Sequence, residues 1–283
     1  SGLKNNFHLL HLDIKANESL TTLGKWSVKK LFTNINLYLK LASILKNEKP
    51  DVVLIPISQA TLGFFKDSIF IIICKIYSRN VLIQLRGSDF KRWIKGASPL
   101  VKFYVKSILK IPKGVIVLGN NLKHLFEDYF TPENIYVVPN GGNYQVPNRA
   151  YEQSGPAKII YLANLQSSKG IEDVIDALKL VNREMPGSFN MQIIGEWRKP
   201  DTKAKCLKII EENNIPVTFY DSSFSKSKID FLSNSDIFVF TPREPEGHPW
   251  VIVEAMASGL AIISTDQGAI VESVIDGQNG FIV

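Results

Sequence analysis

Two glutamates eight positions apart are the residues of this sequence that most clearly could do chemistry. Glu246 lies in a loop-like segment rich in Pro and Gly, and Glu254 falls inside the apolar helical segment that comes next. Pro249 suits the first position of that helix, so the helix is predicted to begin just after His248. Free backbone N–H groups and the positive end of the helix dipole would then offer a site for a diphosphate. The alternative without function is that Glu246 is a solvated loop residue and that Glu254 is only favourably placed near the N-terminus of a helix.

A lysine stands at the end of another strand-like run. The segment from Tyr161 to Gly170 passes from a strand into a loop, and Lys169 with Gly170 comes directly before a helical segment. An ammonium in this place could offset the charge that a leaving diphosphate gains. A lone lysine in a loop is otherwise simply solvated, and both interpretations stay open from the residues alone.

A third polar group follows a strand earlier in the chain. Arg86, Gly87 and Ser88 come directly after an apolar run, where a charged side chain could face a bound anion. The alternative is an ordinary turn in which Ser88 or Asp89 caps the next helix.

Metal chemistry has little support in the sequence. No Asp-x-Asp occurs, and the histidines and cysteines have no ligand spacing. The four histidines are residues 8, 11, 124 and 248, and the two cysteines are Cys74 and Cys206. We therefore expect no metal and no other cofactor, and the two isolated cysteines fit a reducing cytoplasm.

Strand-like and helical segments alternate along the whole chain, which is typical of parallel sheets covered by helices. The fold class is therefore α/β. In the first half we predict strands at Phe7–Ile14, Val52–Pro56, Val81–Leu85, Val115–Leu118 and Ile135–Val138, and helices at Val28–Asn47, Phe64–Tyr77, Pro99–Leu109 and Asn121–Phe130. In the second half we predict strands at Lys158–Leu162, Asn190–Ile194, Val217–Tyr220, Ile237–Thr241 and Ala261–Ser264, and helices at Ile171–Met185, Thr202–Asn213, Lys226–Asn234 and Trp250–Ser258.

The chain is too long for one ordinary core, and a stretch rich in Gly, Asn and Pro divides it. We place a first Rossmann-like domain at residues 1–142, a linker at 143–156 and a second Rossmann-like domain at 157–283. The site is expected in a cleft between them, faced by both parallel sheets. We also expect both ends of the chain to be cut, because it opens without Met and stops in an apolar run.

The segment EGHPWVIVEAMASGLAIISTDQGAIVE, from Glu246 to Glu272, resembles the signature of family 4 retaining glycosyltransferases, the glycosyl transferases group 1. The signature has a Glu, seven intervening residues and a second Glu, followed by Ala-Met-Ala-x-Gly and a Thr-x-x-Gly turn. The resemblance implies the GT-B fold and a nucleoside-diphosphate sugar as co-substrate. It covers nearly the whole chain, strongly after Tyr161 and loosely before it, without the family's first strand and last helices.

The resemblance also assigns roles to residues of the signature. It implies that Glu246 binds hydroxyls of the donor sugar and that Glu254 binds the ribose hydroxyls of the nucleotide. The backbone amides of Gly247, His248 and Trp250 would meet the diphosphate or the sugar.

Other segments resemble the family's remaining donor loops, with departures. Lys169 and Gly170 match a loop that typically carries an Arg and a Lys on the diphosphate, but the Arg position is Asn164 here. Where the family often has His-Gly, this chain has Arg86-Gly87, so Arg86 could face the diphosphate or an anionic acceptor and partly replace the missing Arg. Arg198, after a strand ending in Ile-Gly, resembles the loop beside the base and phosphates. The residues expected on the acceptor side are Gly87, Ser88 and Asn140, the last in a Pro-Asn-Gly turn.

The formal net charge of +6 is concentrated early in the chain. Residues 91–113 contain seven Lys or Arg and no acid, interleaved with aromatic and aliphatic residues, which is typical of a basic amphipathic helix. This stretch is either a solvated helix face or a contact with an anionic membrane surface. The basic residues concerned are Lys91, Arg92, Lys95, Lys102, Lys106 and Lys110. No nucleic-acid-binding module is visible, so nucleic acid is not an expected partner.

Together these patterns predict a metal-independent retaining glycosyltransferase of the hexosyltransferase type, acting on a saccharide or lipid-linked acceptor in bacterial surface polysaccharide or glycolipid synthesis. It would be cytoplasmic or peripheral on the inner face of the cell membrane. Two alternatives stay open: a non-catalytic nucleotide-sugar-binding module, and another GT-B enzyme such as a phosphorylase.

Overall fold

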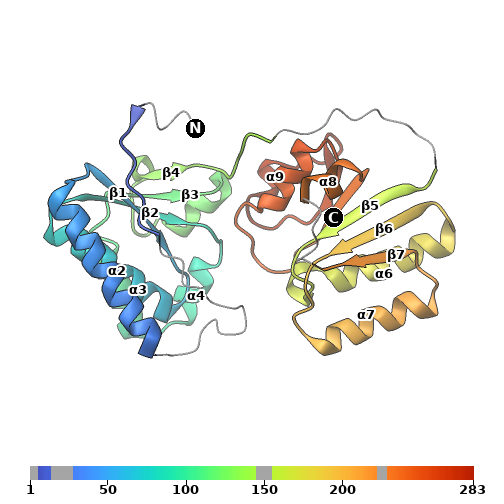
Figure 1. The fold of residues 1–283 in the computed structure, drawn as a ribbon, viewed down its shortest axis with the longest axis horizontal. Helices are drawn as coiled ribbons and strands as arrows, with labels where there is room; N and C mark the ends of the chain where they lie inside the picture. Colours follow the sequence, from blue (N-terminus) through green and yellow to red (C-terminus); the bar gives the residue numbers. More distant parts are fainter. Residues whose placement is uncertain (1–5, 14–27, 145–154, 222–227) are drawn as a thin grey trace. The chain divides into compact units, whose positions relative to one another are not determined.

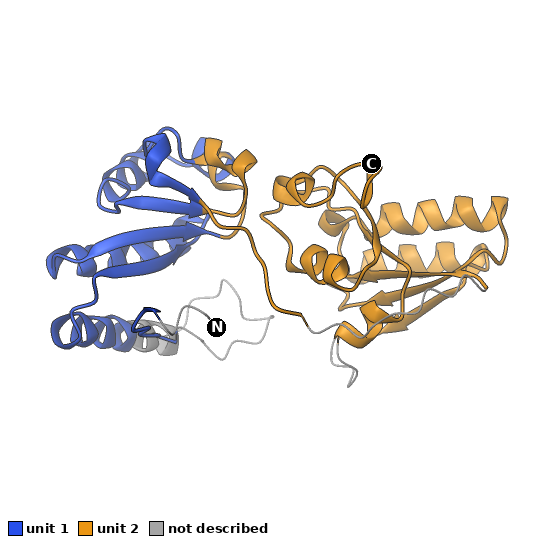
Figure 2. Cartoon of the chain, turned by 90° about the horizontal axis from the view of Figure 1, so that it is seen from above, with its two compact units in different colours: residues 1–85, 92–116, 126–136 blue, residues 86–91, 117–125, 137–283 orange. Residues whose placement is uncertain are grey.

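The computed structural model describes residues 6–13, 28–144, 155–221 and 228–283, and they form an α/β fold (Figure 1). The chain divides into two compact units. The first unit comprises residues 1–85, 92–116 and 126–136, and the second comprises 86–91, 117–125 and 137–283 (Figure 2). Segments 86–91 and 117–125 thus lie within the range predicted for the first domain but belong to the second unit. Most of the predicted linker, residues 145–154, lies outside the described residues.

The first unit is built on a sheet with the strand order β1-β2-β3-β4. Its strands are β1 (Val52–Ile57), β2 (Asn80–Leu85), β3 (Gly114–Val117) and β4 (Ile135–Val137), and its helices are α2 (Val28–Asn47), α3 (Thr61–Ile76), α4 (Phe90–Gly96) and α5 (Pro99–Ile108). Strand β2 pairs in parallel with β1 and with β3. Helix α3 packs on β1 and β2 through buried side chains such as Phe64 and Ile71.

The second unit is built on a sheet with the order β10-β9-β8-β5-β6-β7, and all of its strand pairs are parallel. Its strands are β5 (Ala157–Leu162), β6 (Phe189–Ile194), β7 (Val217–Tyr220), β8 (Ile237–Phe240), β9 (Ala261–Ser264) and β10 (Gly280–Ile282), and its helices are α6 (Ile171–Glu184), α7 (Pro200–Glu212), α8 (Lys228–Ser233) and α9 (Trp250–Ala257). Its short 3-10 helices are η2 (Asn120–Leu125), η4 (Ser167–Lys169) and η5 (Gly268–Glu272), while η3 (Pro132–Asn134) lies in the first unit. This is the doubly wound order, in which the chain leaves β5 toward one edge and returns to β8 on its other side.

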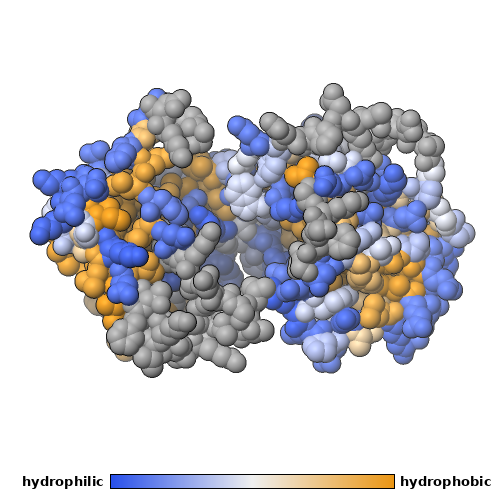
Figure 3. Space-filling view, viewed as in Figure 1, coloured by the Kyte–Doolittle hydropathy of each residue, from blue (hydrophilic) through white to orange (hydrophobic). Residues whose placement is uncertain are grey.

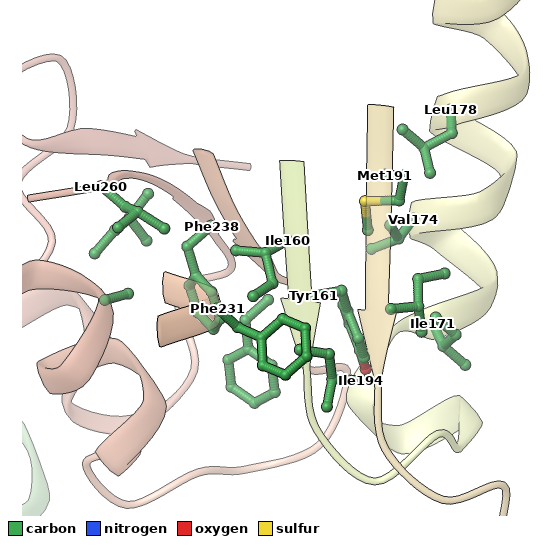
Figure 4. Packing of buried hydrophobic residues seen from close by; sticks show 14 of the residues in the cluster. Ile160, Tyr161, Ile171, Val174, Leu178, Met191, Ile194, Phe231, Phe238 and Leu260 are labelled. Atoms are coloured by element: carbon green, nitrogen blue, oxygen red, sulfur yellow. The ribbon is translucent and has the colours of Figure 1, made fainter. Parts of the chain in front are cut away.

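An apolar cluster holds the second sheet together (Figure 4). Ile160 on β5 lies beside Phe238 on β8, whereas Tyr161 lies on the side of β6, where Ile171 and Val174 of α6 cover the sheet. Each fully buried side chain of this size stabilises the fold by about 1.5–3 kcal/mol. The strands that meet at the centre of this sheet are therefore held in place by their buried side chains.

Three sequence predictions are wrong. No described residue of the expected strand at Phe7–Ile14 is in a strand, and Phe7 and Leu9 are exposed. An apolar run alone does not make a strand without a neighbour to pair with. Ile14 itself lies outside the described residues. The basic stretch is not one helix: α4 ends at Gly96, and α5 starts anew with Ser98 as its cap and Pro99 in its first turn.

The expected α-helix at Asn121–Phe130 is a 3-10 helix that ends at Leu125. The side-chain amide of Asn121 donates to the carbonyl of Gly268, and its backbone N–H donates to Glu272. These contacts lie within the second unit and compete with the hydrogen bonds of a regular helix. Strand β10 was not foreseen.

Candidate active site

The carboxyl ends of β5 and β8 carry the two residues that the sequence singled out most clearly. The loop after β5 leads to Lys169 at the end of η4, and the loop after β8 leads to Glu246. Because β5 and β8 are neighbours in the sheet and parallel, both loops leave from the same edge. That place is the switch point of the doubly wound sheet, where ligands of such folds bind.

The structure brings these two residues into contact. The ammonium of Lys169 donates to a carboxylate oxygen of Glu246, and the side chains are 25% and 16% exposed. The same ammonium lies 5.9 Å from the centre of the Phe240 ring, which adds a cation–π attraction. The sequence prediction had given each residue a role at the site without foreseeing that they pair.

Buried contacts fix the backbone around Lys169. The hydroxyl of Tyr161 donates to the carbonyl of Lys169 at 2.8 Å, and burial, with the nearby Glu246 carboxylate, raises the pKa of Tyr161 far above its usual range, so it remains a donor. Gly170 has a φ of +76°, and a Cβ at that position would collide with the carbonyl oxygen of Thr241. A glycine here lets the loop after β5 press against the loop after β8.

The second loop is held from the other side as well. Arg243 donates its backbone N–H to Ser168 at 3.1 Å, and its guanidinium pairs with Asp173 and Glu172 at the start of α6. The two loops are therefore joined by backbone and side-chain bonds on both flanks of the Lys169–Glu246 pair.

Gly247 and Gly268 are both needed for close backbone approaches. A Cβ on Gly247 would meet the carbonyl oxygen of Arg86, and one on Gly268 would meet the carbonyl oxygen of Glu246. The backbone of Arg86 thus lies against the signature loop, although its side chain is exposed. Next to it, the hydroxyl of Ser88 is buried and has no hydrogen-bond partner among the described residues. Gly87 is half-buried in the same turn.

The ring of His248 is engaged on both nitrogens. Its Nδ1 accepts the backbone N–H of Asn140 at 3.0 Å, so its Nε2 carries the proton and donates to the hydroxyl of Ser273 at 2.7 Å. The amide of Asn140 also donates to the His248 carbonyl at 2.6 Å. Burial lowers the pKa of His248, while the nearby Glu272 carboxylate partly opposes this. The ring therefore joins the segment of Asn140 to the signature. Only the backbone amide of His248 is left for the contact with the diphosphate or the sugar that was inferred from the sequence.

Helix α9 begins at Trp250, as the predicted range Trp250–Ser258 has it, but Pro249 is its N-terminal cap residue and not its first helical residue. Trp250 is 48% exposed. Glu254 lies inside the helix and is only 7% exposed. Its Oε1 accepts a hydrogen bond from Lys228 at 2.6 Å, whereas its Oε2 is buried with no partner in the described part of the chain. Burial, with the Glu254 carboxylate nearby, raises the pKa of Tyr144, which places that phenol in the same neighbourhood.

Lys228 and Tyr144 are the neighbours of Glu254 that the sequence prediction missed. Lys228 stands 26 positions before Glu254 on another helix, and no motif or spacing marks it. Only the packing of α8 against α9 brings it there.

Asn164 and Arg198 come together in the loops after β5 and β6. The side-chain oxygen of Asn164 accepts from the guanidinium of Arg198 at 2.8 Å. Backbone bonds between Leu165 and Glu196, and between Arg198 and Leu165, join the same two loops. Arg198 also lies 3.8 Å from the carboxylate of Glu196. A cation is thus present beside position 164, although it comes from a different strand end.

Within the described residues, no group of three or more His, Cys, Asp or Glu side chains is placed to hold a metal ion. None of the helices in that part of the chain is long and apolar enough to cross a membrane.

Solved structures share this architecture. Anabaena HepE in complex with UDP superposes with a TM-score of 0.70 at 18% identity, covering 88% of this chain and 68% of that one. A glycosyltransferase from Rickettsia africae gives a TM-score of 0.69 at 22% identity, covering 92% and 69%. The fold is therefore the GT-B fold of glycosyltransferases.

Residues 146–283 match the family model of the glycosyl transferases group 1, in agreement with the resemblance of the segment Glu246 to Glu272. It is 24% identical to an uncharacterized glycosyltransferase of Methanocaldococcus jannaschii, over 71% of this chain and 53% of that protein. It is also 24% identical to the capsular polysaccharide biosynthesis glycosyltransferase CapM of Staphylococcus aureus, over 89% of this chain and 68% of that protein. The chain thus spans between about half and two thirds of the length of these relatives.

Proposed function

We propose that this chain belongs to a retaining glycosyltransferase that moves a sugar from a nucleoside-diphosphate sugar to an acceptor hydroxyl. The observation that carries the proposal is the contact between Lys169 and Glu246 at the switch point of the second sheet. A cation that could bind a diphosphate and a carboxylate that could accept from sugar hydroxyls meet there. One of the solved structures with this fold is a complex with UDP.

The donor would lie along the strand ends of the second unit. Its diphosphate is expected on Lys169 and on the backbone amides of Gly247, His248 and Trp250 at the start of α9. Its sugar hydroxyls would bind Glu246, and its ribose would bind Glu254. Arriving phosphate oxygens would attract Lys169 and so free the Glu246 carboxylate for the sugar, which couples the two halves of donor binding.

The chemical step follows from this arrangement. The bond between the anomeric carbon and the diphosphate oxygen breaks, and a bond to the acceptor oxygen forms on the same face of the sugar. The acceptor proton passes to the departing phosphate oxygen, so the product is a free nucleoside diphosphate and no side-chain base is required. Lys169 and the helix N-terminus stabilise the charge that builds up on the leaving group. With no Asp-x-Asp in the chain, we propose that the reaction needs no metal.

The acceptor is proposed to be a saccharide or a lipid-linked saccharide of the bacterial surface. The name of the relative CapM, from capsular polysaccharide biosynthesis, supports this class of product. The basic helices α4 and α5 would hold the protein at the cytoplasmic face of an anionic membrane, where such acceptors are presented.

Release of free nucleoside diphosphate from a panel of nucleotide sugars tests the proposal. Glu246→Gln and Lys169→Met are each expected to lower the rate of release by roughly 10²–10³-fold, because each removes a group that stabilises the transition state. Addition of EDTA is expected to leave the rate unchanged. Glu244→Gln is the matched control, since Glu244 is an exposed glutamate in the same loop.

Two outcomes separate the alternatives. A non-catalytic nucleotide-sugar-binding module would bind a donor without transfer or hydrolysis, and Glu246→Ala would change nothing. A phosphorylase would require inorganic phosphate as the acceptor and would release a sugar phosphate instead.

A further inference from the structure

The carboxylate of Glu254 is left half satisfied in the structure. The residue is 7% exposed, and its Oε1 accepts a hydrogen bond from the ammonium of Lys228 at 2.6 Å. Its Oε2 is buried and has no hydrogen-bond partner among the residues that the structure describes. A buried polar atom of this kind costs free energy unless something satisfies it, and buried carboxylate oxygens are normally bonded. The orphan oxygen therefore indicates a place where a ligand hydroxyl binds.

Lys228 decides which of the two oxygens is left free. It begins α8, and its side chain reaches across to α9 while remaining 43% exposed. A charge-assisted hydrogen bond this short holds the carboxylate plane in one orientation. Without the ammonium, both oxygens of Glu254 would compete for the same hydroxyl, and the carboxylate could turn toward other donors.

We propose that Lys228 is a positioning residue for the donor nucleotide: it holds Oε1 of Glu254 and thereby presents Oε2 to a ribose hydroxyl. This inference rests on the proposed function, in which Glu254 binds the ribose. It adds a residue from outside the signature that makes recognition of the ribose diol depend on a lysine two elements earlier in the chain.

Because the Lys228–Glu254 pair is proposed to contact only the ribose hydroxyls, changing Lys228 should affect only nucleotides that carry them. Removing the ammonium with Lys228→Met should weaken binding of a nucleoside diphosphate about tenfold, because one well-placed hydrogen bond to a charged group is lost or misdirected. Binding of the 2′,3′-dideoxy form, which lacks both hydroxyls, should not change. Lys228→Arg should keep most of the preference for the ribose form, since a guanidinium also donates to a carboxylate.

The experiment is calorimetric titration of the 283-residue chain with UDP, GDP and ADP, followed by the dideoxy form of the nucleotide that binds most tightly. Lys208→Met is the matched control, because Lys208 is also in a lysine–glutamate ion pair of the second unit, on the exposed face of α7. It removes the same charge and is expected to leave both affinities unchanged. Far-UV circular dichroism of every variant verifies that the fold is retained.

Glu254→Gln separates this inference from the proposed function. If Glu254→Gln abolishes the preference for the ribose form while Lys228→Met leaves it intact, the positioning role is overturned and the donor site stands. If Lys228→Met lowers the affinity for the ribose form and for the dideoxy form equally, the positioning role is also overturned, because Lys228 would then act on the diphosphate. If none of the three nucleotides binds, or Glu254→Gln has no effect, the assignment of the donor site itself fails.

Discussion

His248 ties the segment of Asn140 to the signature loop through a ring that must stay neutral. Its Nδ1 can accept the N–H of Asn140 only without a proton, and burial lowers its pKa below the usual 6.5. Because the folded state takes up this proton less readily than the unfolded state, the contribution of His248 to stability is complete above pH 6.5. It is lost as the pH falls from there through the lower pKa of the folded state.

Urea unfolding on the acid side of neutrality measures this loss. The wild-type chain should lose more stability between neutral pH and the folded pKa of His248 than His248→Gln does, because the variant has no ring to protonate. His8→Gln, at an exposed histidine, is the control and should follow the wild type. A pH profile shared by all three proteins would show that the ring of His248 does not titrate in this way.

Single residues were predictable from the sequence to different degrees. Glu246 and Lys169 stand in motifs, and the structure places both at one sheet edge. The ion pair between them was not foreseeable, because spacing along the chain does not tell where a side chain points. Lys228 has no motif at all. The missing Arg at Asn164 led us to expect help from Arg86, whereas the structure sets the guanidinium of Arg198 against Asn164. The roles of these residues in donor binding stay predictions.

At the scale of elements, the tight joint between the loop after β5 and the loop after β8 depends on Gly170. Gly170 has a φ of +76°, and a Cβ there would collide with the carbonyl oxygen of Thr241. Gly187 has nearly the same φ, +77°, but a Cβ there would meet nothing within 4 Å. The two glycines therefore separate the cost of the left-handed backbone from the cost of the collision.

Gly187→Ala should lower the free energy of unfolding by about 1 kcal/mol, the ordinary cost of a non-glycine residue in the left-handed region. Gly170→Ala should cost roughly 3 kcal/mol or more, because the loops must also move apart. The midpoints of urea unfolding give both values. Equal shifts for the two variants would contradict the close contact between Gly170 and Thr241.

Elements were predicted best where periodicity and capping residues agree. The described ends of the strands and helices from β5 to β9 lie within about two residues of their predicted bounds, because alternating apolar runs are bounded there by Gly, Pro and Asn. The predicted start of the helix Lys226–Asn234 lies outside the described residues. The failures have different physical causes. The run at Phe7–Ile14 has no neighbour to pair with among the described residues, and the segment after Asn120 is held by Glu272 and Gly268, which lie about 150 positions away.

At the scale of the whole molecule, charge and apolar exposure gather in the first unit. Figure 3 shows apolar side chains over the part of this unit where α2 and α3 lie. On α3 and α5 the exposed apolar residues are Leu62, Phe65, Ile69, Ile76, Leu100 and Phe103. The two helices are joined by a hydrogen bond of 2.6 Å between Ser68 and Tyr104, so they present these side chains together. The sequence predicted the basic and aromatic character of α4 and α5 but not the contribution of α3, which only the packing reveals.

This surface leads to a prediction for membrane binding. The chain should sediment with vesicles rich in phosphatidylglycerol but not with pure phosphatidylcholine, and added salt should release it, because basic side chains near an anionic surface contribute about 1 kcal/mol each. Lys102→Glu with Lys106→Glu should abolish binding, and Phe103→Ser should weaken it by removing an apolar side chain that is 73% exposed. Lys203→Glu with Lys208→Glu on α7 changes the net charge equally and should leave binding intact. If both double variants lose binding alike, total charge and not this surface governs attachment, and the basic helices are then an ordinary solvated face.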